Sequence, residues 1–279
     1  MQQAINYLKS ELAPIYQEPE LSSIARLIVS KITGYSYTEI LVNKNTIFSQ
    51  YQRNLLEFYL EKLKKGMPVQ YVMGETEFCG LNFVVGESVL IPRPETEELV
   101  AWIAEETKPD ALILDIGTGS GCIAVSLKKF IPGSEVYACD ISTEALNVAR
   151  LNAEKNNQQV FFFEMDILNT TTAERKYHLI VSNPPYIPES EIDTILPQVK
   201  DYEPHQALFV TDDDPLIFYR KIAIYAQQHL YPGGKLFFEI HRDYANACVS
   251  MLKDKNFDNI IMKKDISGND RMIRAEKKL

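Results

Sequence analysis

The feature that most constrains the fold of this 279-residue sequence is a glycine-rich segment that follows a short apolar run. Residues 111–116 are apolar except for Asp115, and they lead into Gly117-Thr118-Gly119-Ser120-Gly121 and a helical pattern from Cys122. Glycines allow a tight turn and let a ligand approach the backbone closely at a helix amino terminus. The G-x-G-x-G spacing differs from the G-x-G-x-x-G of nicotinamide and flavin folds. The strand, the glycine-rich turn and the helix that follows together predict an open α/β sheet with a ligand site at the end of this strand.

Two further apolar segments, residues 135–140 and 160–165, are followed or closed by acids, Asp140 and Asp166. A carboxylate at the end of the second strand is placed to accept hydrogen bonds from a ribose diol. Asp166 is placed to meet an adenine amino group. Together with Asp115, these acids disfavour phosphates and favour a cationic, phosphate-free nucleoside such as S-adenosylmethionine. Taken singly, each acid has an alternative role as a helix N-cap.

A fourth strand is predicted at residues 177–181, and it stops at Asn183-Pro184-Pro185-Tyr186. Neither proline can donate to a sheet, and each restricts the residue before it, so the turn is stiff. It offers the side-chain carbonyl of Asn183 and the backbone carbonyl of Pro184 as acceptors, with the ring of Tyr186 beside them. This combination predicts a receptor for a planar NH₂ group, the nitrogen of which is a poor nucleophile because its lone pair is delocalised. An ordinary turn is the alternative interpretation.

Composition bounds the class of protein. The hydrophobic fraction is 46% and the charged fraction 24%, as in an ordinary globular protein with material for a core. The net charge of −9 disfavours duplex nucleic acid as a partner, because phosphate contacts supply most of the affinity in such complexes. The four cysteines and four histidines show no metal-ligand spacing, so we predict free thiols and no metal site. Without a signal sequence or an apolar run of membrane-spanning length, a cytoplasmic enzyme is expected.

The amino-terminal region, residues 1–68, is predicted to be a helical domain. One buried helix face is formed by Leu21, Ile24, Ala25, Ile28, Val29 and Ile32, and Gly34 ends the pattern. A second helix is predicted over residues 49–65 with a stripe of Leu55, Phe58, Tyr59 and Leu63. Partner binding and simple packing are both compatible with this bundle.

Residues 69–88 are predicted to form a linking β-hairpin, with strands over 69–73 and 81–85. The catalytic domain is expected over residues 89–279. It opens with Ile91-Pro92-Arg93-Pro94-Glu95-Thr96-Glu97, of which Pro94 suits the first turn of a helix that reaches about residue 107. Arg93, held between two prolines, is predicted to form a wall of the site, with a surface turn as the alternative.

The remaining elements complete an α/β domain. Asp212-Asp213-Asp214 is predicted to cap a helix over residues 215–230 rather than to bind a metal. Residues 232–234 are predicted to turn into a strand over 235–240, and a helix over 244–255 precedes two closing strands.

Three motifs together carry a resemblance to a known family: residues 91–97, residues 115–121 and Asn183-Pro184-Pro185-Tyr186. The chain resembles the PrmC/HemK family of protein-(glutamine-N5) methyltransferases that act on bacterial peptide chain release factors. This resemblance implies a class I, Rossmann-like S-adenosylmethionine-dependent methyltransferase sheet of seven strands with an antiparallel last pair. It implies transfer of a methyl group to the side-chain nitrogen of the glutamine in the Gly-Gly-Gln loop of class I release factors.

The resemblance also implies roles for residues. Gly117, Thr118, Gly119, Ser120 and Gly121 would line the methionine part of the cofactor, Asp140 its ribose and Asp166 its adenine. Asp115 would also belong to the cofactor site. Ile167, where the family usually has tryptophan, would lie beside the adenine, and Asn183 would also adjoin the cofactor. Asn183, Pro184, Pro185 and Tyr186 would be catalytic and hold the glutamine, with Arg93 nearby.

The amino-terminal helices and hairpin would contact the release factor, and we expect a monomer with no direct nucleic-acid or membrane binding. Two rivals remain at this point. One is a DNA or RNA amino-methyltransferase, since adenine N6 presents the same planar NH₂. The other is an inactive S-adenosylmethionine-binding adaptor, which would have no need of an amide receptor.

Overall fold

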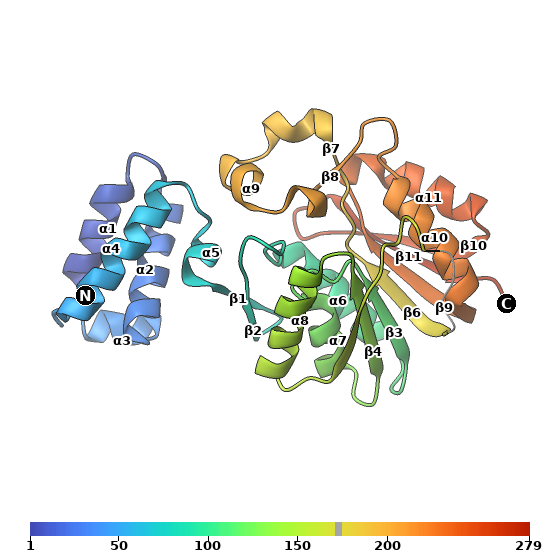
Figure 1. Cartoon of the computed structure of the whole chain (residues 1–279), viewed down its shortest axis with the longest axis horizontal. Coiled ribbons are helices and arrows are strands. Elements are labelled where there is room, and N and C mark those ends of the chain that lie inside the picture. The colour runs from blue at the N-terminus through green and yellow to red at the C-terminus, as the bar shows by residue number, and fades with distance from the viewer. Residues whose placement is uncertain (171–174) are drawn as a thin grey trace. The chain divides into compact units, whose positions relative to one another are not determined.

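The computed structural model describes residues 1–170 and 175–279. The chain consists of two compact units (Figure 1). The first comprises Met1–Gly74 with Leu196–Tyr202, and the second comprises Glu75–Ile195 with Glu203–Leu279. No helix among the described residues is both long and apolar enough to cross a bilayer.

The first unit is helical. Its helices are α1 (Gln2–Leu12), α2 (Glu20–Thr33), α3 (Tyr37–Val42), α4 (Gln50–Lys64), α5 (Val69–Met73) and α9 (Pro197–Tyr202). The predicted face of α2 is confirmed for Leu21, Ile24, Ala25, Ile28 and Val29, which are buried, whereas Ile32 is only partly buried. Gly34 ends the helix in a left-handed conformation. Leu8 and Leu12 of α1 and Leu60 and Leu63 of α4 close the same core.

Two predictions for this unit are wrong. The strand over residues 69–73 is the short helix α5, which buries Tyr71 and Val72 and ends at a left-handed Gly74. Five residues are too few for periodicity to separate a helix from a strand. The buried face of α4 consists of Leu56, Tyr59, Leu60 and Leu63, whereas Phe58 is half exposed. The buried face of α4 therefore lies about one residue further along the helix than predicted.

The hairpin predicted before the catalytic domain is formed by β1 (Glu75–Phe78) and β2 (Leu81–Val84), which pair antiparallel. Both strands belong to the second unit. Phe78 and Phe83 pack edge to face in that unit's core, which anchors the hairpin there.

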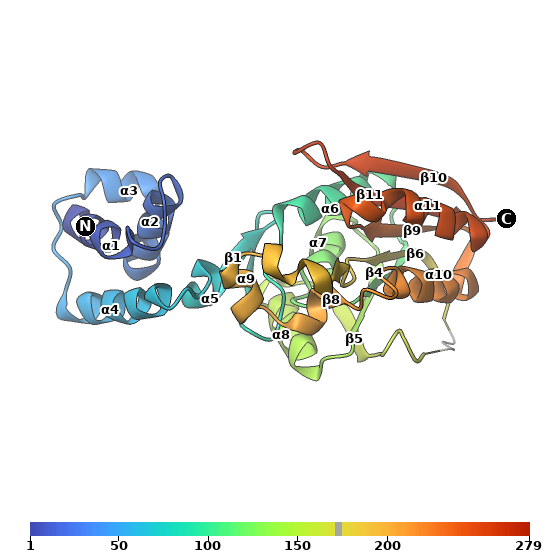
Figure 2. The ribbon, with the colours of Figure 1, turned by 90° about the horizontal axis from the view of Figure 1, so that it is seen from above.

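A seven-stranded sheet forms the centre of the second unit. Its spatial order is β10-β11-β9-β6-β3-β4-β5, and Figure 2 shows β10 and β5 at its opposite edges. The strands are β3 (Leu112–Ile116), β4 (Glu135–Asp140), β5 (Val160–Glu164), β6 (Tyr177–Ser182), β9 (Leu230–Glu239), β10 (Phe257–Lys264) and β11 (Asp270–Lys277). From β5 to β9 all neighbours are parallel, whereas β11 runs antiparallel to both β9 and β10. The predicted sheet and its antiparallel last pair are confirmed.

Helices cover both faces of this sheet (Figure 1). One face carries α6 (Pro94–Glu106), α7 (Cys122–Phe130) and α8 (Thr143–Lys155), and the other carries α10 (Ile217–His229) and α11 (Ala245–Asp254). Because side chains alternate along a strand, Ile113 faces α6 and α7 while Leu114 faces α10. This two-sided burial explains why the central strands are nearly continuous apolar runs.

Two local predictions in the second half of the chain are wrong. Helix α10 begins at Ile217 with Leu216 at its N-cap position, and no aspartate side chain caps it. Instead, the Asp214 carboxylate pairs with Arg220 at 2.5 and 2.8 Å. Strand β9 begins at Leu230, so it includes the predicted turn over residues 232–234.

The connection from β6 to α10 contains short elements only. These are β7 (Ile187–Pro188), the 3-10 helix η1 (Glu189–Thr194), α9 of the first unit, the 3-10 helix η2 (His205–Ala207) and β8 (Phe209–Val210). Strands β7 and β8 pair in parallel, which draws the residues after Tyr186 against those after Leu208. A last 3-10 helix, η3 (Arg242–Tyr244), precedes α11.

Candidate functional site

A cavity of about 250 Å³ lies at the carboxyl ends of the central parallel strands. Open α/β sheets bind ligands at this edge. The predicted site residues that line it are Arg93, Gly117, Thr118, Gly119, Ser120, Asp140, Asp166, Ile167, Asn183, Pro184 and Pro185. Asp115, Gly121 and Tyr186 are not part of its wall.

The loop after β3 presents backbone to the cavity. Gly117 and Gly119 have φ angles of 73° and 53°, values that L-residues adopt rarely. A Cβ placed on either would meet no atom within 4 Å, so the space beside them is open. Gly121 serves packing instead, because a Cβ there would lie 3.0 Å from the Cβ of Ala149 on α8. Gly121 therefore packs against α8 and does not line the cavity.

Asp140 ends β4 and is bonded to the glycine loop. Its Oδ2 accepts from the backbone N–H of Gly119 at 2.8 Å, and its Oδ1 accepts from that of Ser142 at 3.0 Å. Burial raises the pKa of this carboxyl, although the backbone hydrogen bonds oppose the rise. A carboxylate offers about four acceptor sites, and the backbone N–H groups of Gly119, Ser142 and Ile141 use three of them, so Asp140 can still bind a hydroxyl donor while it holds the loop.

Asp166 follows β5 and combines a turn role with a place in the cavity wall. Its carboxylate accepts from the backbone N–H of Leu168 at 2.9 Å and from the Asn169 amide at 2.6 Å. Ile167, next in the chain, lines the cavity together with Ile141 and Phe218. Carboxylates therefore adjoin an apolar part of the cavity wall.

Asp115 occupies a different position from the other acids. It lies within β3 rather than after it, and alternation turns its side chain toward the same face as Ile113. The carboxyl is fully buried; Thr118 Oγ1 donates to its Oδ2 at 2.6 Å, and its Oδ1 has no partner among the described residues. Burial is the main cause that raises its pKa to about 7. Asp115 thus supports the glycine loop from beneath.

Stability should depend on the protonation of Asp115. Its folded pKa of about 7 exceeds the ordinary value of 3.8, so the folded state binds more protons than the unfolded state between these pH values. The free energy of unfolding must then fall as pH rises through this window, by roughly 2–4 kcal/mol from this group. Asp115→Asn should remove this dependence, as urea unfolding of both proteins at several pH values between 4 and 8 would measure.

The exposed Asp213→Asn provides a matched control for that change, and its pH profile should follow that of the wild type. Parallel profiles for the wild type and Asp115→Asn would show that the buried carboxyl does not titrate in this range.

The turn after β6 presents two acceptors to the cavity. The side-chain Nδ2 of Asn183 donates to Thr96 Oγ1 at 3.4 Å, which directs the amide NH₂ toward α6. Among the described residues, no donor reaches Asn183 Oδ1 or the backbone carbonyl oxygen of Pro184. Both residues line the cavity, so these two oxygens are available to a ligand.

Tyr186 lies behind the Asn-Pro-Pro turn rather than in the cavity wall. Its hydroxyl donates to Glu239 Oε1 at 3.2 Å, and its ring meets His241 edge to face at 5.9 Å. Burial and the neighbouring Glu239 carboxylate raise the pKa of this hydroxyl. It is therefore a neutral hydrogen-bond donor that packs the motif against β9.

Arg93 lines the cavity and is held by a buried acid. Its guanidinium pairs with Glu203 at 2.6 Å, and the other oxygen of Glu203 accepts from the backbone N–H of Ile91 at 3.1 Å. Glu203 therefore holds the guanidinium in addition to the restriction that the flanking prolines place on the backbone.

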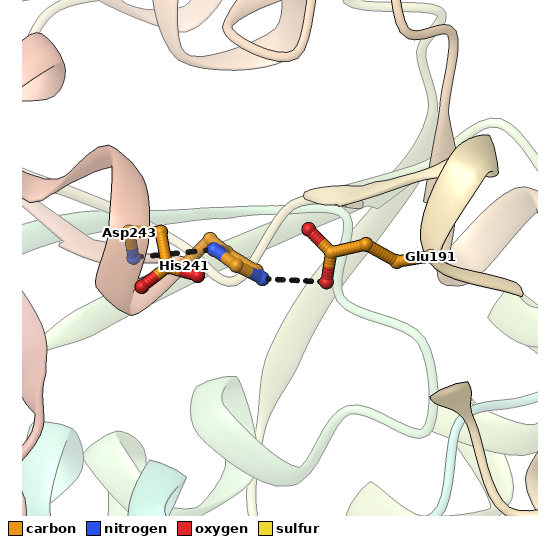
Figure 3. A group of neighbouring side chains, drawn as sticks. All are labelled: Glu191, His241 and Asp243. Atoms are coloured by element: carbon orange, nitrogen blue, oxygen red, sulfur yellow. Dashed lines mark hydrogen bonds and ion pairs between the residues drawn. The ribbon is translucent and has the colours of Figure 1, made fainter. Parts of the chain in front are cut away.

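His241 lies in a polar group with Glu191 and Asp243 (Figure 3). Its Nε2 is 3.3 Å from Glu191, and its Nδ1 accepts from the backbone N–H of Asp243 at 3.3 Å. Since Nδ1 is an acceptor, the proton of a neutral imidazole lies on Nε2 and points to Glu191. This arrangement favours a hydrogen-bonded pair over a metal site, and it ties η1 to the end of β9.

Several cavity residues have no counterpart among the predicted site residues. These are Thr96, Ile141, Phe218, Gln206 and the segment 88–90. Ile141 directly follows Asp140, so its place beside the carboxylate was available from the sequence. Thr96 lies within the motif at residues 91–97, which marked its segment but not its side chain. Phe218, Gln206 and the segment 88–90 come from distant parts of the chain, and no local pattern marks them.

Two family models match the chain. Residues 3–74 match the PrmC N-terminal domain, and residues 95–199 match the methyltransferase small domain. A release factor glutamine methyltransferase of Flavobacterium psychrophilum is 44% identical over 95% of this chain and 94% of its own length. The chain belongs to the release factor glutamine methyltransferase family.

Other members of the release factor glutamine methyltransferase family agree with this assignment. The protein of Bacteroides thetaiotaomicron is 43% identical over 97% of this chain and 98% of its own length. That of Staphylococcus aureus is 36% identical over 89% of this chain and 90% of its own length. As a member of this family the chain is a methyltransferase, and the resemblance inferred from its motifs is confirmed.

Solved structures support the fold. A methyltransferase from Pyrococcus furiosus aligns with a TM-score of 0.54 at 20% identity, covering 83% of this chain and all of that one. The 16S rRNA N2 G1207 methyltransferase of Thermus thermophilus aligns with a TM-score of 0.53 at 19% identity, covering 73% of this chain and 50% of that one. At such low identity these alignments establish the fold alone.

Proposed function

We propose that this chain transfers a methyl group from S-adenosylmethionine to the side-chain nitrogen, N5, of the glutamine in the Gly-Gly-Gln loop of class I peptide chain release factors. One observation carries the proposal beyond family membership. The two available acceptors, Asn183 Oδ1 and the Pro184 carbonyl, adjoin the same cavity as the glycine loop and the Asp140 and Asp166 carboxylates. The groups that would bind the substrate amide and those that would bind the nucleoside therefore line one cavity.

The cavity residues fit S-adenosylmethionine, which supplies an electrophilic methyl group when bound. The open backbone at Gly117 and Gly119 would accommodate its methionine part, and Asp140 would accept from the ribose hydroxyls. Asp166 would accept from the adenine amine, with Ile141, Ile167 and Phe218 against the ring. Ile167 alone is a small stacking surface, so the Phe218 ring takes part of the role that the family usually gives to tryptophan. Among the described residues that line the cavity, Arg93 is the only Lys or Arg, and Glu203 pairs with it, so the wall suits a cationic ligand without phosphates.

The Asn-Pro-Pro turn would orient the substrate amide. Accepting both N–H bonds, at Asn183 Oδ1 and the Pro184 carbonyl, holds the nitrogen and stabilises the positive charge that it acquires during alkylation. Pro184 and Pro185 restrict the backbone, so these acceptors are arranged before the substrate arrives. A strong base is unnecessary, because the nitrogen becomes acidic only after it has reacted. Tyr186 supports the turn from behind, and Arg93 with Glu203 shapes the rim.

The helical unit would bind the body of the release factor. Several large apolar side chains are exposed on it: Tyr37, Leu41, Val42, Ile47 and Tyr51. Val42 and Ile47 are 78% and 76% exposed, so charged substitutions there should not disturb folding.

Val42→Asp combined with Ile47→Asp is expected to raise KM for intact release factor about 10-fold or more, since a charge opposes burial of an apolar contact. Affinity for S-adenosylmethionine should not change. Steady-state kinetics and calorimetry measure the two quantities. Ile266→Asp is the matched control, because Ile266 is also a highly exposed isoleucine but belongs to the second unit. An unchanged KM for the double variant would remove Val42 and Ile47 from the interface.

Labelled S-adenosylmethionine tests the proposed function directly. The parallel acceptors are unmethylated release factor, its Gln→Ala variant in the Gly-Gly-Gln loop, and unmethylated DNA and RNA. Label on the wild-type factor alone is the expected result. Label on nucleic acid would favour an adenine N6 methyltransferase, and binding of the cofactor without transfer to any acceptor would favour an inactive adaptor.

A further inference from the structure

The carboxylate of Glu239 lies at the end of β9 and reaches two segments of the site. The residue is 1% exposed. Its Oε2 accepts from Thr96 Oγ1 of α6 at 2.6 Å, and its Oε1 accepts from the Tyr186 hydroxyl at 3.2 Å. One buried acid therefore bonds to the helix beside the cavity and to the Asn-Pro-Pro-Tyr motif.

The direction of these hydrogen bonds decides the orientation of Asn183. Thr96 Oγ1 donates to Glu239 Oε2, so the single hydroxyl proton of Thr96 is used in that bond. Toward Asn183, Thr96 Oγ1 can then act only as an acceptor. The NH₂ end of the Asn183 amide must face Thr96, as the 3.4 Å contact from Nδ2 records, and the carbonyl end faces away from it.

Opposing influences act on the Glu239 carboxyl, and burial raises its pKa overall. Glu95 of α6 adds to the effect of burial, whereas the hydrogen bond from Thr96 and the attraction of the Arg271 guanidinium of β11 lower the pKa. Arg271 is itself held by Asp265 at 3.1 Å and by the Ile240 carbonyl at 3.4 Å. The two hydrogen bonds that Glu239 accepts add to the attraction, because charge-assisted bonds stabilise the anion.

We propose that Thr96 and Glu239 are positioning residues that hold the Asn183 amide with its carbonyl oxygen toward the substrate nitrogen. The inference rests on the proposed function, in which that oxygen accepts from a planar NH₂ group. Without the chain of bonds the amide can turn over, and its NH₂ would then meet the NH₂ of the substrate, donor against donor. Glu239 would thus fix the orientation of Asn183 through Thr96, although neither Thr96 nor Glu239 bonds to the substrate amide.

Thr96→Val tests this with little change of shape. We expect kcat for release factor methylation to fall about 10-fold, with KM and cofactor affinity within about twofold of the wild type, as for loss of an interaction made in the transition state. Thr96→Ser restores the hydroxyl and should recover most of kcat. Glu239→Gln places an amide donor in the network and should resemble Thr96→Val. Wild-type kcat in Thr96→Val would overturn the proposal.

A double-mutant cycle separates positioning from general structural support. In an Asn183→Ala background, Thr96→Val should cost nothing further, because the group that it orients is gone. Additive losses would show that Thr96 acts on something other than Asn183.

The side-chain amide signal of Asn183 in ¹⁵N-labelled protein gives a readout that needs no substrate. It is assigned by its absence from Asn183→Ala. Its position should be the same in the wild type and Thr96→Ser and should move or broaden in Thr96→Val. An unmoved signal in Thr96→Val would contradict the proposal even if the enzyme proved inactive on release factors. If the wild-type enzyme did not methylate release factor but the Asn183 signal still moved in Thr96→Val, only the proposed function would be overturned.

Discussion

Asn183→Ala is expected to lower kcat for release factor methylation about 10²-fold or more while leaving affinity for S-adenosylmethionine nearly unchanged. The physical reason is that the variant removes one of two preorganised acceptors, Asn183 Oδ1 and the Pro184 carbonyl, that adjoin the cavity. The contribution of such an acceptor grows as the substrate nitrogen becomes positively charged, so its loss affects the transition state more than the bound substrate. Single-turnover kinetics measure the rate, and calorimetry measures cofactor affinity.

Asn147→Ala is the matched control for this variant. Asn147 lies on the exposed side of α8, where its amide contacts Arg150, and its removal should leave both quantities unchanged. If Asn183→Ala weakened cofactor binding as much as it slowed turnover, Asn183 would belong to the cofactor site instead of the amide receptor.

Asp140→Asn is expected to raise the dissociation constant for S-adenosylmethionine about 10- to 100-fold, the cost of losing a hydrogen bond to a charged acceptor. Asp140 also holds Gly119 and Ser142 through their backbone N–H groups, so part of the loss could come from the loop. Calorimetry with two competitors separates these contributions. Adenosine should lose affinity much more than 2′,3′-dideoxyadenosine, because only adenosine offers the ribose hydroxyls.

An equal loss for both competitors would assign the effect to the loop, and an unchanged dissociation constant would refute the ribose contact. The exposed Asp213→Asn serves as the control, since it removes the same charge away from the cavity.

Much of the second unit follows from local patterns. The predicted central strands match β3, β4, β5 and β6 closely, because a buried parallel strand needs a continuous apolar run. The helix from Pro94 also begins where the sequence predicts it, since proline at the first helical position restricts the chain there. Predictions were wrong where two structures satisfy the same short pattern, as in α5 and in the start of β9.

Some of the site residues could also be predicted from local patterns, whereas others could not. Gly117, Gly119, Asp140, Asp166 and Asn183 could be predicted because each stands at a strand end, and parallel strands bring those ends to one edge. Asp115 was grouped with the other acids, yet it lies one residue before its strand ends, and alternation buries it under the loop. Tyr186 was expected in the cavity, but it packs behind the turn against β9.

By itself, the sequence determined the central parallel strands, the helix that begins at Pro94, the stiff Asn-Pro-Pro turn and the acids at the strand ends. Each of these depends on residues that are neighbours in the chain, where backbone restriction and side-chain periodicity act. Only the tertiary structure decided that Thr96, Asn183 and Glu239 form one chain of hydrogen bonds. These residues are far apart in sequence, and their contact depends on packing α6 and β9 against the end of β6, which no local pattern encodes.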